Sequence, residues 1–168
     1  MRERAKAFVA LGANLGEREA QVERALLSLA AGGIRTARRS SLYLTEPVGG
    51  PPQDWYVNAA AELDTVLSPE GLLLACLEVE RGMGRVRTVK DGPRSIDIDL
   101  LLHGSEIRDR EGLVLPHPRM HLRRFVLVPL SEIAPATVHP TLGLTVSELL
   151  ARCPDPSLVR AFAPAGVK

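Results

Sequence analysis

Short β-compatible runs and amphipathic helical runs alternate along the first part of the chain. Strands are predicted over residues 7–11, 34–43, 56–66 and 96–102. One helical run follows the first strand and ends at Gly32-Gly33, and the other begins at Ser68-Pro69, where serine can cap a helix. The order strand, helix, strand, strand, helix, strand predicts a ferredoxin-like α+β sandwich, in which an antiparallel sheet has helices on one face.

The remaining residues predict extra C-terminal helices and a loose end. Helices are expected over residues 122–133 and 145–152, the second beginning at a threonine cap. Residues 154–168 contain three prolines and are expected to form a loosely held tail. The chain shows no internal repeat and no linker, so residues 1–168 are predicted to form a single domain.

Composition and charge restrict the class of partner. The chain has 21 basic and 20 acidic residues, so its net charge of +1 gives no overall attraction to nucleic acid or to a membrane. The apolar run at residues 7–11 is too short for a secretion signal. Cys76 and Cys153 lie far apart in the sequence, which favours a reducing compartment over a disulfide scaffold. We therefore expect a monomer in the cytoplasm.

Two aspartates stand out within the strand predicted at residues 96–102. Side chains of a strand alternate between its faces, so Asp97 and Asp99 should project from one face about 7 Å apart. The pair fits a solvated strand face and a metal site about equally well. A hard cation such as Mg²⁺ commonly takes one or two protein carboxylates when a phosphate supplies further oxygens.

Basic residues gather on either side of these acids. Between residues 81 and 94 they are Arg81, Arg85, Arg87, Lys90 and Arg94, and between residues 117 and 124 they are Arg119, Arg123 and Arg124. Each arginine taken singly is adequately explained by a surface ion pair. The group as a whole, placed around two carboxylates, indicates a polyphosphate site.

Common nucleotide and covalent-catalysis motifs do not occur in the sequence. There is no P-loop motif, and Gly82-Met83-Gly84 lacks the third glycine of a dinucleotide fingerprint. There is also no G-x-S-x-G elbow. These absences favour direct group transfer with a nucleotide held by side chains.

From about Phe8 to Thr145 the chain resembles the 6-hydroxymethyl-7,8-dihydropterin pyrophosphokinases of folate biosynthesis. The matching segments are LGANLG (11–16), TEPVG (45–49), YVNA (56–59), GRVR (84–87), GPRSIDID (92–99) and LPHPRM (115–120). The resemblance implies the ferredoxin-like fold. It also implies Mg²⁺-dependent transfer of the β,γ-pyrophosphoryl group of ATP, the co-substrate, to the hydroxymethyl oxygen of the pterin, with release of AMP.

The resemblance also implies roles for individual residues. Asp97 and Asp99 are similar to the ligands of two Mg²⁺ ions, and Arg85 and Arg94 to phosphate clamps that act in catalysis with them. The implied ATP contacts are Glu80, Arg85, Arg87, Arg94, Leu100, His117 and Arg123, and the implied pterin contacts are Thr45, Val48, Tyr56, Asn58 and Phe125. The alternative for Tyr56 and Phe125 is ordinary core packing. Asn14 and Gly16 are interpreted as a turn at the start of a helix.

Two positions depart from the family pattern. Asp91 stands where some members carry an aromatic that stacks on the pterin, and Leu77 where some carry a polar residue that reaches adenine. Trp55 is the nearest other aromatic, but the resemblance does not place it as a substitute. The alternatives from other functional classes are a ferredoxin-like RNA-binding module and a nucleotide-binding protein without turnover.

Overall fold

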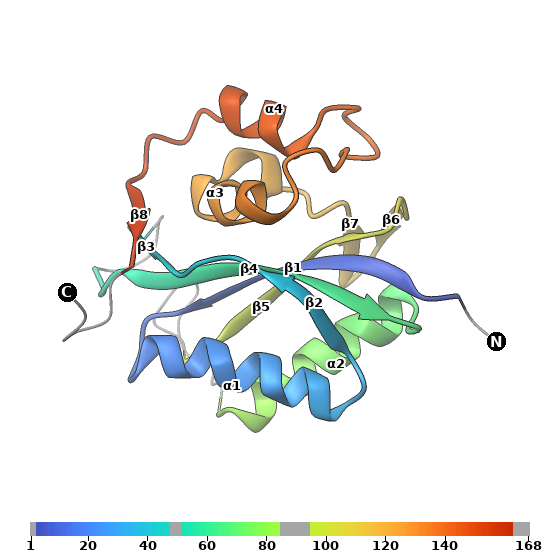
Figure 1. Cartoon of the computed structure of the whole chain (residues 1–168), viewed down its shortest axis with the longest axis horizontal. Coiled ribbons are helices and arrows are strands. Elements are labelled where there is room, and N and C mark those ends of the chain that lie inside the picture. Colours follow the sequence, from blue (N-terminus) through green and yellow to red (C-terminus); the bar gives the residue numbers. More distant parts are fainter. Residues whose placement is uncertain (1–2, 48–51, 85–94, 163–168) are drawn as a thin grey trace.

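A six-stranded antiparallel sheet forms the centre of the computed structural model, which describes residues 3–47, 52–84 and 95–162 (Figure 1). The strands are β1 (Ala5–Ala13), β2 (Arg35–Arg39), β3 (Tyr43–Thr45), β4 (Tyr56–Thr65), β5 (Asp97–His103) and β8 (Val159–Ala161). Their order is β5-β1-β4-β3-β8, and β2 pairs with the other part of β4. Thus β4 lies between β1 and β2, and β1 lies between β4 and β5.

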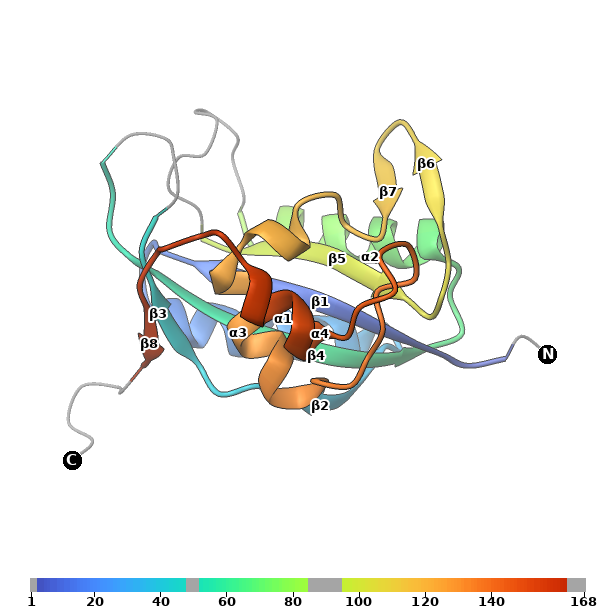
Figure 2. The same ribbon diagram turned by 90° about the horizontal axis from the view of Figure 1, so that it is seen from above.

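Helices cover both faces of the sheet (Figures 1 and 2). α1 (Arg18–Ala31) and α2 (Pro69–Gly82) lie on one face, as the sequence predicts for its first two helices. The extra helices α3 (Arg124–Ile133) and α4 (Val146–Arg152) lie on the other face, preceded by a short 3-10 turn, η1 (Met120–Leu122). Side chains of β1 point alternately to the two faces of the sheet and contribute to both helix layers. Val9 and Leu11 pack toward α1 and α2, and Phe8 packs toward α3.

The predicted helix caps are confirmed. The Ser68 hydroxyl accepts a hydrogen bond from the Gly71 amide at 3.1 Å at the start of α2. Thr145 and Glu148 form a reciprocal capping box at the start of α4. The helix expected from residue 122 begins instead at Arg124, because residues 120–122 are wound as the 3-10 turn.

The strand expected over residues 34–43 is in fact two strands, β2 and β3. Ser40 interrupts it, because its hydroxyl accepts a hydrogen bond from the Ala60 amide that a ladder partner would otherwise engage. A hairpin of β6 (Arg108–Arg110) and β7 (Leu113–Leu115), which the sequence analysis did not predict, follows β5. Of the helices within the described ranges, none combines the length and the apolar character needed to cross a bilayer.

The C-terminal segment adds a strand to the edge of the sheet. The sequence predicts a loosely held tail over residues 154–168; within it β8 pairs with β3 and the Phe162 amide donates to the Leu42 carbonyl at 3.0 Å, while residues 163–168 lie outside the described residues. Pro154 and Pro156 precede the paired residues, so they remove no hydrogen bond of this ladder. This pairing brings the end of the described chain to the edge of the sheet beside β3.

Candidate active site

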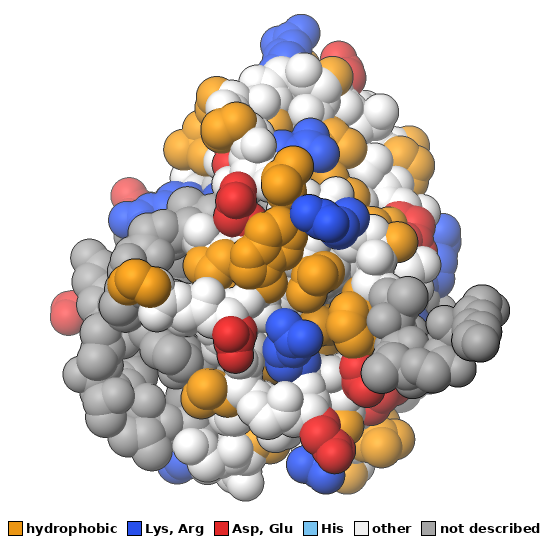
Figure 3. All heavy atoms as spheres, turned by 90° about the vertical axis from the view of Figure 1, so that its left-hand side faces the viewer, with side chains coloured by type: hydrophobic (Ala, Val, Ile, Leu, Met, Phe, Trp, Pro, Cys, Tyr) orange, Lys and Arg blue, Asp and Glu red, His pale blue; other side chains and the backbone are white. Residues whose placement is uncertain are grey.

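A pocket opens where the ends of β1, β4 and β5 meet the start of α3. Its lining residues are Ala10, Leu11, Gly12, Thr45, Glu46, Pro47, Gln53, Tyr56, Asn58, Asp97, Asp99, Arg123 and Phe125. Figure 3 shows this end of the molecule, where hydrophobic side chains gather with basic and acidic side chains beside them. The pocket therefore offers an apolar surface and charged groups together.

Both acids singled out in the sequence line this pocket. Asp97 pairs with Gly12 and Asp99 with Ala10 across β1, and the two carboxylates share the α3 side of the sheet. The intervening Ile98 packs in the opposite core, on the α1 and α2 side. The prediction that the aspartates share one face is confirmed.

Leu100 lies on that opposite face with Ile98. Its side chain is only 5% exposed and packs in the core against the helices. Leu100 is not among the described residues that line the pocket, and the ATP contact that the resemblance implies for this position stays a prediction.

Glu80 contacts the aspartate strand from beneath. Its side chain on α2 is 3% exposed, and its Oε2 accepts a hydrogen bond from the Ile98 amide at 2.7 Å. That amide lies between the two aspartates in sequence. This contact positions β5, and the nucleotide contact that the resemblance implies for Glu80 stays a prediction.

An amide and a hydroxyl form the polar end of the pocket. Asn58 on β4 donates from Nδ2 to Thr45 Oγ1 at 2.5 Å, and both residues are buried. Gly12 leaves the space that this amide occupies, because a Cβ built there would lie 2.4 Å from Asn58 Oδ1. Tyr56 and Phe125 also line the pocket, as the implied pterin contact would require. Four of the five implied pterin contacts thus surround one space.

Arg123 and His117 supply cationic and hydrogen-bonding groups nearby. Arg123 lines the pocket, and its guanidinium carbon lies 5.5 Å from the centroid of the Phe125 ring. The pKa of His117 is lowered to about 4, chiefly by burial and also by the charges of Arg123 and Arg119, while the charge of Asp97 opposes them. His117 Nδ1 accepts from the Arg119 amide at 3.1 Å, so the proton of the neutral ring is on Nε2. The ring is a neutral donor near pH 7.

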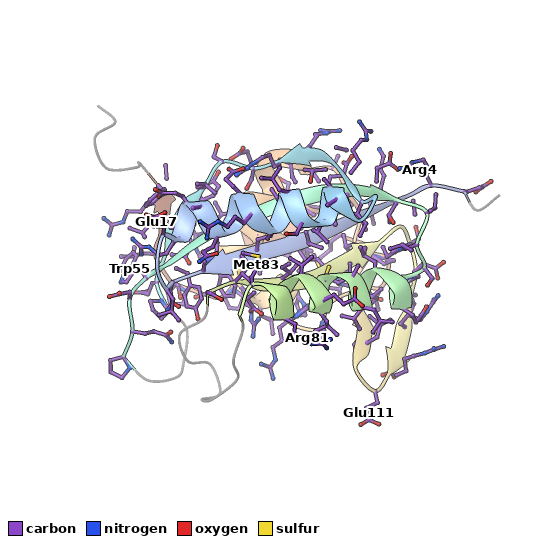
Figure 4. The ribbon with its side chains drawn as sticks, turned by 90° about the horizontal axis from the view of Figure 1, so that it is seen from below. Arg4, Glu17, Trp55, Arg81, Met83 and Glu111 are labelled. Atoms are coloured by element: carbon purple, nitrogen blue, oxygen red, sulfur yellow. The ribbon has the colours of Figure 1, made fainter. Side chains whose placement is uncertain are left out.

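Asn14 has a structural role that the sequence reading missed. Its side chain is 3% exposed, and Nδ2 donates to Gln53 Oε1 at 2.7 Å and to the Asp54 carbonyl at 3.1 Å. Arg18 on α1 donates to the Trp55 carbonyl at 2.6 Å, and Figure 4 shows Trp55 beside the start of that helix. These bonds fasten residues 53–55, which lead into β4. A polar residue directly after a buried strand was the available signal.

Several predicted positions lie outside the described residues. They are Val48, Arg85, Arg87, Asp91 and Arg94. Within the described ranges no group of three or more His, Cys, Asp or Glu side chains is arranged to hold a metal ion. Two carboxylates on one pocket wall nevertheless fit a hard cation that takes its other ligands from phosphate and water.

Comparisons with known proteins identify the family. The model of the 7,8-dihydro-6-hydroxymethylpterin-pyrophosphokinase family matches residues 8–135. A 2-amino-4-hydroxy-6-hydroxymethyldihydropteridine pyrophosphokinase from Methylorubrum extorquens is 49% identical over 90% of this chain and 95% of its own length. One of the same name from Pseudomonas aeruginosa is 40% identical over 92% of this chain and 96% of its own length.

Solved structures agree on the fold. The Plasmodium falciparum HPPK-DHPS with pteroate superposes with a TM-score of 0.72 at 14% identity, over 90% of this chain and 43% of that one. At this identity the likeness speaks for the fold alone. Taken with the family match and the two close relatives, it places the chain in the 7,8-dihydro-6-hydroxymethylpterin-pyrophosphokinase family.

Proposed function

We propose that this protein transfers the β,γ-pyrophosphoryl group of ATP to the hydroxymethyl oxygen of 6-hydroxymethyl-7,8-dihydropterin by direct in-line displacement. The products are AMP and the pterin pyrophosphate. The observation that carries the proposal is one pocket that holds two carboxylates, Asp97 and Asp99, together with the buried amide of Asn58. The names of the close relatives support the same reaction.

The amide end of the pocket suits the pterin ring. Asn58 offers a carbonyl oxygen and an NH₂ group, which can pair with the donor and acceptor edge of such a ring. Its bond to Thr45 fixes the amide orientation before substrate arrives. Tyr56 and Phe125 supply aromatic surface beside it. We assign Val48, from its position in the family motif, to the same subsite.

The acidic end suits the phosphates of ATP with magnesium. Asp97 and Asp99 would hold two Mg²⁺ ions, which would neutralise phosphate charge and fix the attacking and leaving oxygens. Glu80 keeps the backbone between these acids in place through Ile98. The acids therefore keep one spacing on a rigid strand.

Basic and neutral donors complete the phosphate side. Arg123 can contact phosphate oxygens from the pocket wall, and His117 can donate from Nε2 without adding charge. We assign Arg85 and Arg94 to the transferred group and Arg87 to the nucleotide, on the basis of the family motifs. A guanidinium aimed at charge that develops in the transition state lowers the barrier of the chemical step.

Three further assignments belong to this proposal. The strand order β5-β1-β4-β2, with α1 and α2 on one face, supports classification of the core as ferredoxin-like. The proposed state is a monomer. The proposed location is the cytoplasm, where reduced cysteines such as Cys76 and Cys153 persist.

Measuring AMP release from ATP tests the function, with and without the hydroxymethyl pterin. We expect release to require both the pterin and Mg²⁺, and to fall about a hundredfold or more in Asp97→Asn and in Asp99→Asn. Asp109→Asn, which changes an exposed carboxylate on β6, is the matched control and should retain the wild-type rate.

Three results would count against the proposal. AMP release at equal rates without pterin would indicate a nucleotide hydrolase. ATP binding without any release would indicate a nucleotide-binding protein without turnover. An aspartate variant that keeps the wild-type rate would remove that acid from the mechanism.

A further inference from the structure

The segment that follows α4 returns to the active-site pocket. Residues 155–162, named here the C-terminal strap, run from the start of α3 to the outer edge of β3 (Figures 1 and 2). The family model ends at residue 135, before this segment. The strap residues that contact the pocket lining therefore lie outside the part of the chain that the family model matches.

Asp155 caps α3 from this distant segment. Its Oδ2 accepts a hydrogen bond from the Arg124 amide at 3.0 Å, at the first residue of the helix. Within the described part of the chain, Arg123 at the N-cap position makes no side-chain hydrogen bond to the helix. The amides of a first helical turn lack partners inside the helix, so an external carboxylate stabilises this end.

The Asp155 carboxylate is itself held in place. Its Oδ1 accepts from the Ser157 amide at 2.9 Å and from the Ser157 hydroxyl at 2.5 Å. Burial raises the pKa of Asp155, but the bonds from Ser157 and Arg124 outweigh burial and leave the pKa below its usual value. The group is therefore charged near pH 7, and each of its oxygens has a partner.

The strap also fastens the opposite wall of the pocket. The Glu46 amide donates to the Leu158 carbonyl, and the Leu158 amide donates to Glu46 Oε1, both at 3.2 Å. Val159 then pairs with Thr45 across β8 and β3. Thr45 and Glu46 line the pocket beside the strap, and Phe125 lines it from α3. One short segment thus contacts two separate parts of the pocket lining.

The far end of α3 is anchored independently. Glu132 accepts from the Tyr43 hydroxyl at 2.5 Å and from the Ser41 amide at 2.8 Å. At the pocket end, Arg124 Nε also donates to the Ser157 carbonyl at 3.2 Å, so removing Asp155 takes away the backbone cap and the bonds that hold Ser157, and leaves this single side-chain contact. The other end of α3 stays attached to the segment around β3. The change should be local.

We propose that Asp155 is a positioning residue for the pterin side of the pocket: by capping α3 from the strap, it fixes Phe125 relative to Thr45. Naming the pterin as the ligand rests on the proposed function. Phe125 has two side-chain torsions and follows its backbone, so a loosened first turn displaces the ring. Arg123 has a longer side chain that can still reach a phosphate. The acids lie on β5, and the hydrogen bonds described above for the strap and the cap join other residues.

The test compares Asp155→Ala with the control Thr145→Ala. Thr145 caps α4, and none of the described residues that line the pocket belongs to α4. Binding is measured for the pterin in the presence of a non-hydrolysable ATP analogue, and for the analogue alone. We expect Asp155→Ala to raise the pterin dissociation constant about fivefold, with analogue binding and the rate at saturating pterin within about twofold. Thr145→Ala should lower the melting temperature similarly and leave both constants unchanged.

Asp155→Asn gives a graded second variant. An amide has one oxygen, so it can accept from Arg124 or from Ser157 but not from both as the carboxylate does, and we expect an intermediate loss. Faster hydrogen exchange of the Arg124 amide in Asp155→Ala, in the ligand-free protein, would support the cap independently of any substrate.

Two outcomes would overturn the proposal. One is unchanged pterin binding in Asp155→Ala despite a lower melting temperature, which would make the cap purely structural. The other is equal weakening by Thr145→Ala. Wild-type protein that binds the analogue but no pterin would instead contradict the proposed function, and the Arg124 exchange would still decide whether Asp155 holds the helix.

Discussion

Gly12→Ala should weaken pterin binding by displacing the Asn58 amide. The added Cβ would lie 2.4 Å from Asn58 Oδ1 and 3.3 Å from its Cγ, whereas ordinary contacts of a Cβ begin near 3.4 Å. The amide oxygen must therefore move by about 1 Å. Asn58 is buried and bonded to Thr45 at 2.5 Å, so it cannot move that far and keep the bond.

The size of the effect follows from that hydrogen bond. Leaving a buried polar partner unsatisfied costs about 1–3 kcal/mol. The free energy of unfolding should fall by this amount in the ligand-free protein. If the displaced amide must return to pair with the ring, the same cost raises the pterin dissociation constant roughly 5- to 150-fold. Binding of an ATP analogue alone should change little, because the change lies at the amide end of the pocket.

Calorimetric titration with pterin and with the ATP analogue, beside thermal unfolding, measures these quantities. Gly71→Ala is the matched control, because its Cβ would meet its nearest neighbours at 3.4 Å or more inside α2. It should leave binding unchanged and add stability of about 0.5–1 kcal/mol. Wild-type pterin affinity in Gly12→Ala would refute the reasoning, since it would show that the Asn58 amide either does not move or does not bind the ring.

Two other residues give separate tests. The His117 ring, followed by NMR, should titrate near pH 4, below the usual 6.5. The unfolded chain therefore binds this proton at a higher pH than the folded chain, so His117 should lower the free energy of unfolding progressively as the pH falls from about 6.5 to 4. A measured pKa above 6 would contradict the burial of this ring. Glu80→Ala should destabilise the fold by about 1–3 kcal/mol and slow AMP release, because the Ile98 amide loses its acceptor. Glu80→Gln should keep most of the stability and most of the rate of AMP release. A Gln variant as impaired as the Ala variant would show that the charge of Glu80 is needed.

The sequence predicts best those features that depend on local pattern. The alternation of Asp97, Ile98 and Asp99 places the acids on one face, and that placement is confirmed. The caps at Ser68 and Thr145 were predictable because each satisfies amides within its own first turn. The same alternation places Leu100 with Ile98 in the core, although the family resemblance had assigned it to ATP.

Features that depend on distant partners were not predictable in this way. The break at Ser40 requires knowing that its hydroxyl meets the Ala60 amide of another strand. The cap that Asp155 gives to Arg124 joins segments about thirty residues apart, so the sequence shows only a proline-rich stretch. The tight fit of Gly12 against Asn58 appears only when β1 and β4 are in register.

The position of β5 beside β1 also affects how the protein folds. Gly12 and Asp97 are paired, although one lies near the start of the chain and the other beyond its middle. Closing such a long loop is among the slow events of chain assembly, because its entropy is lost before the contacts form. The carboxylates join Asn58 in one pocket only after that closure. A ligand that needs both acids therefore stabilises the finished sheet by mass action and cannot act as a template for it.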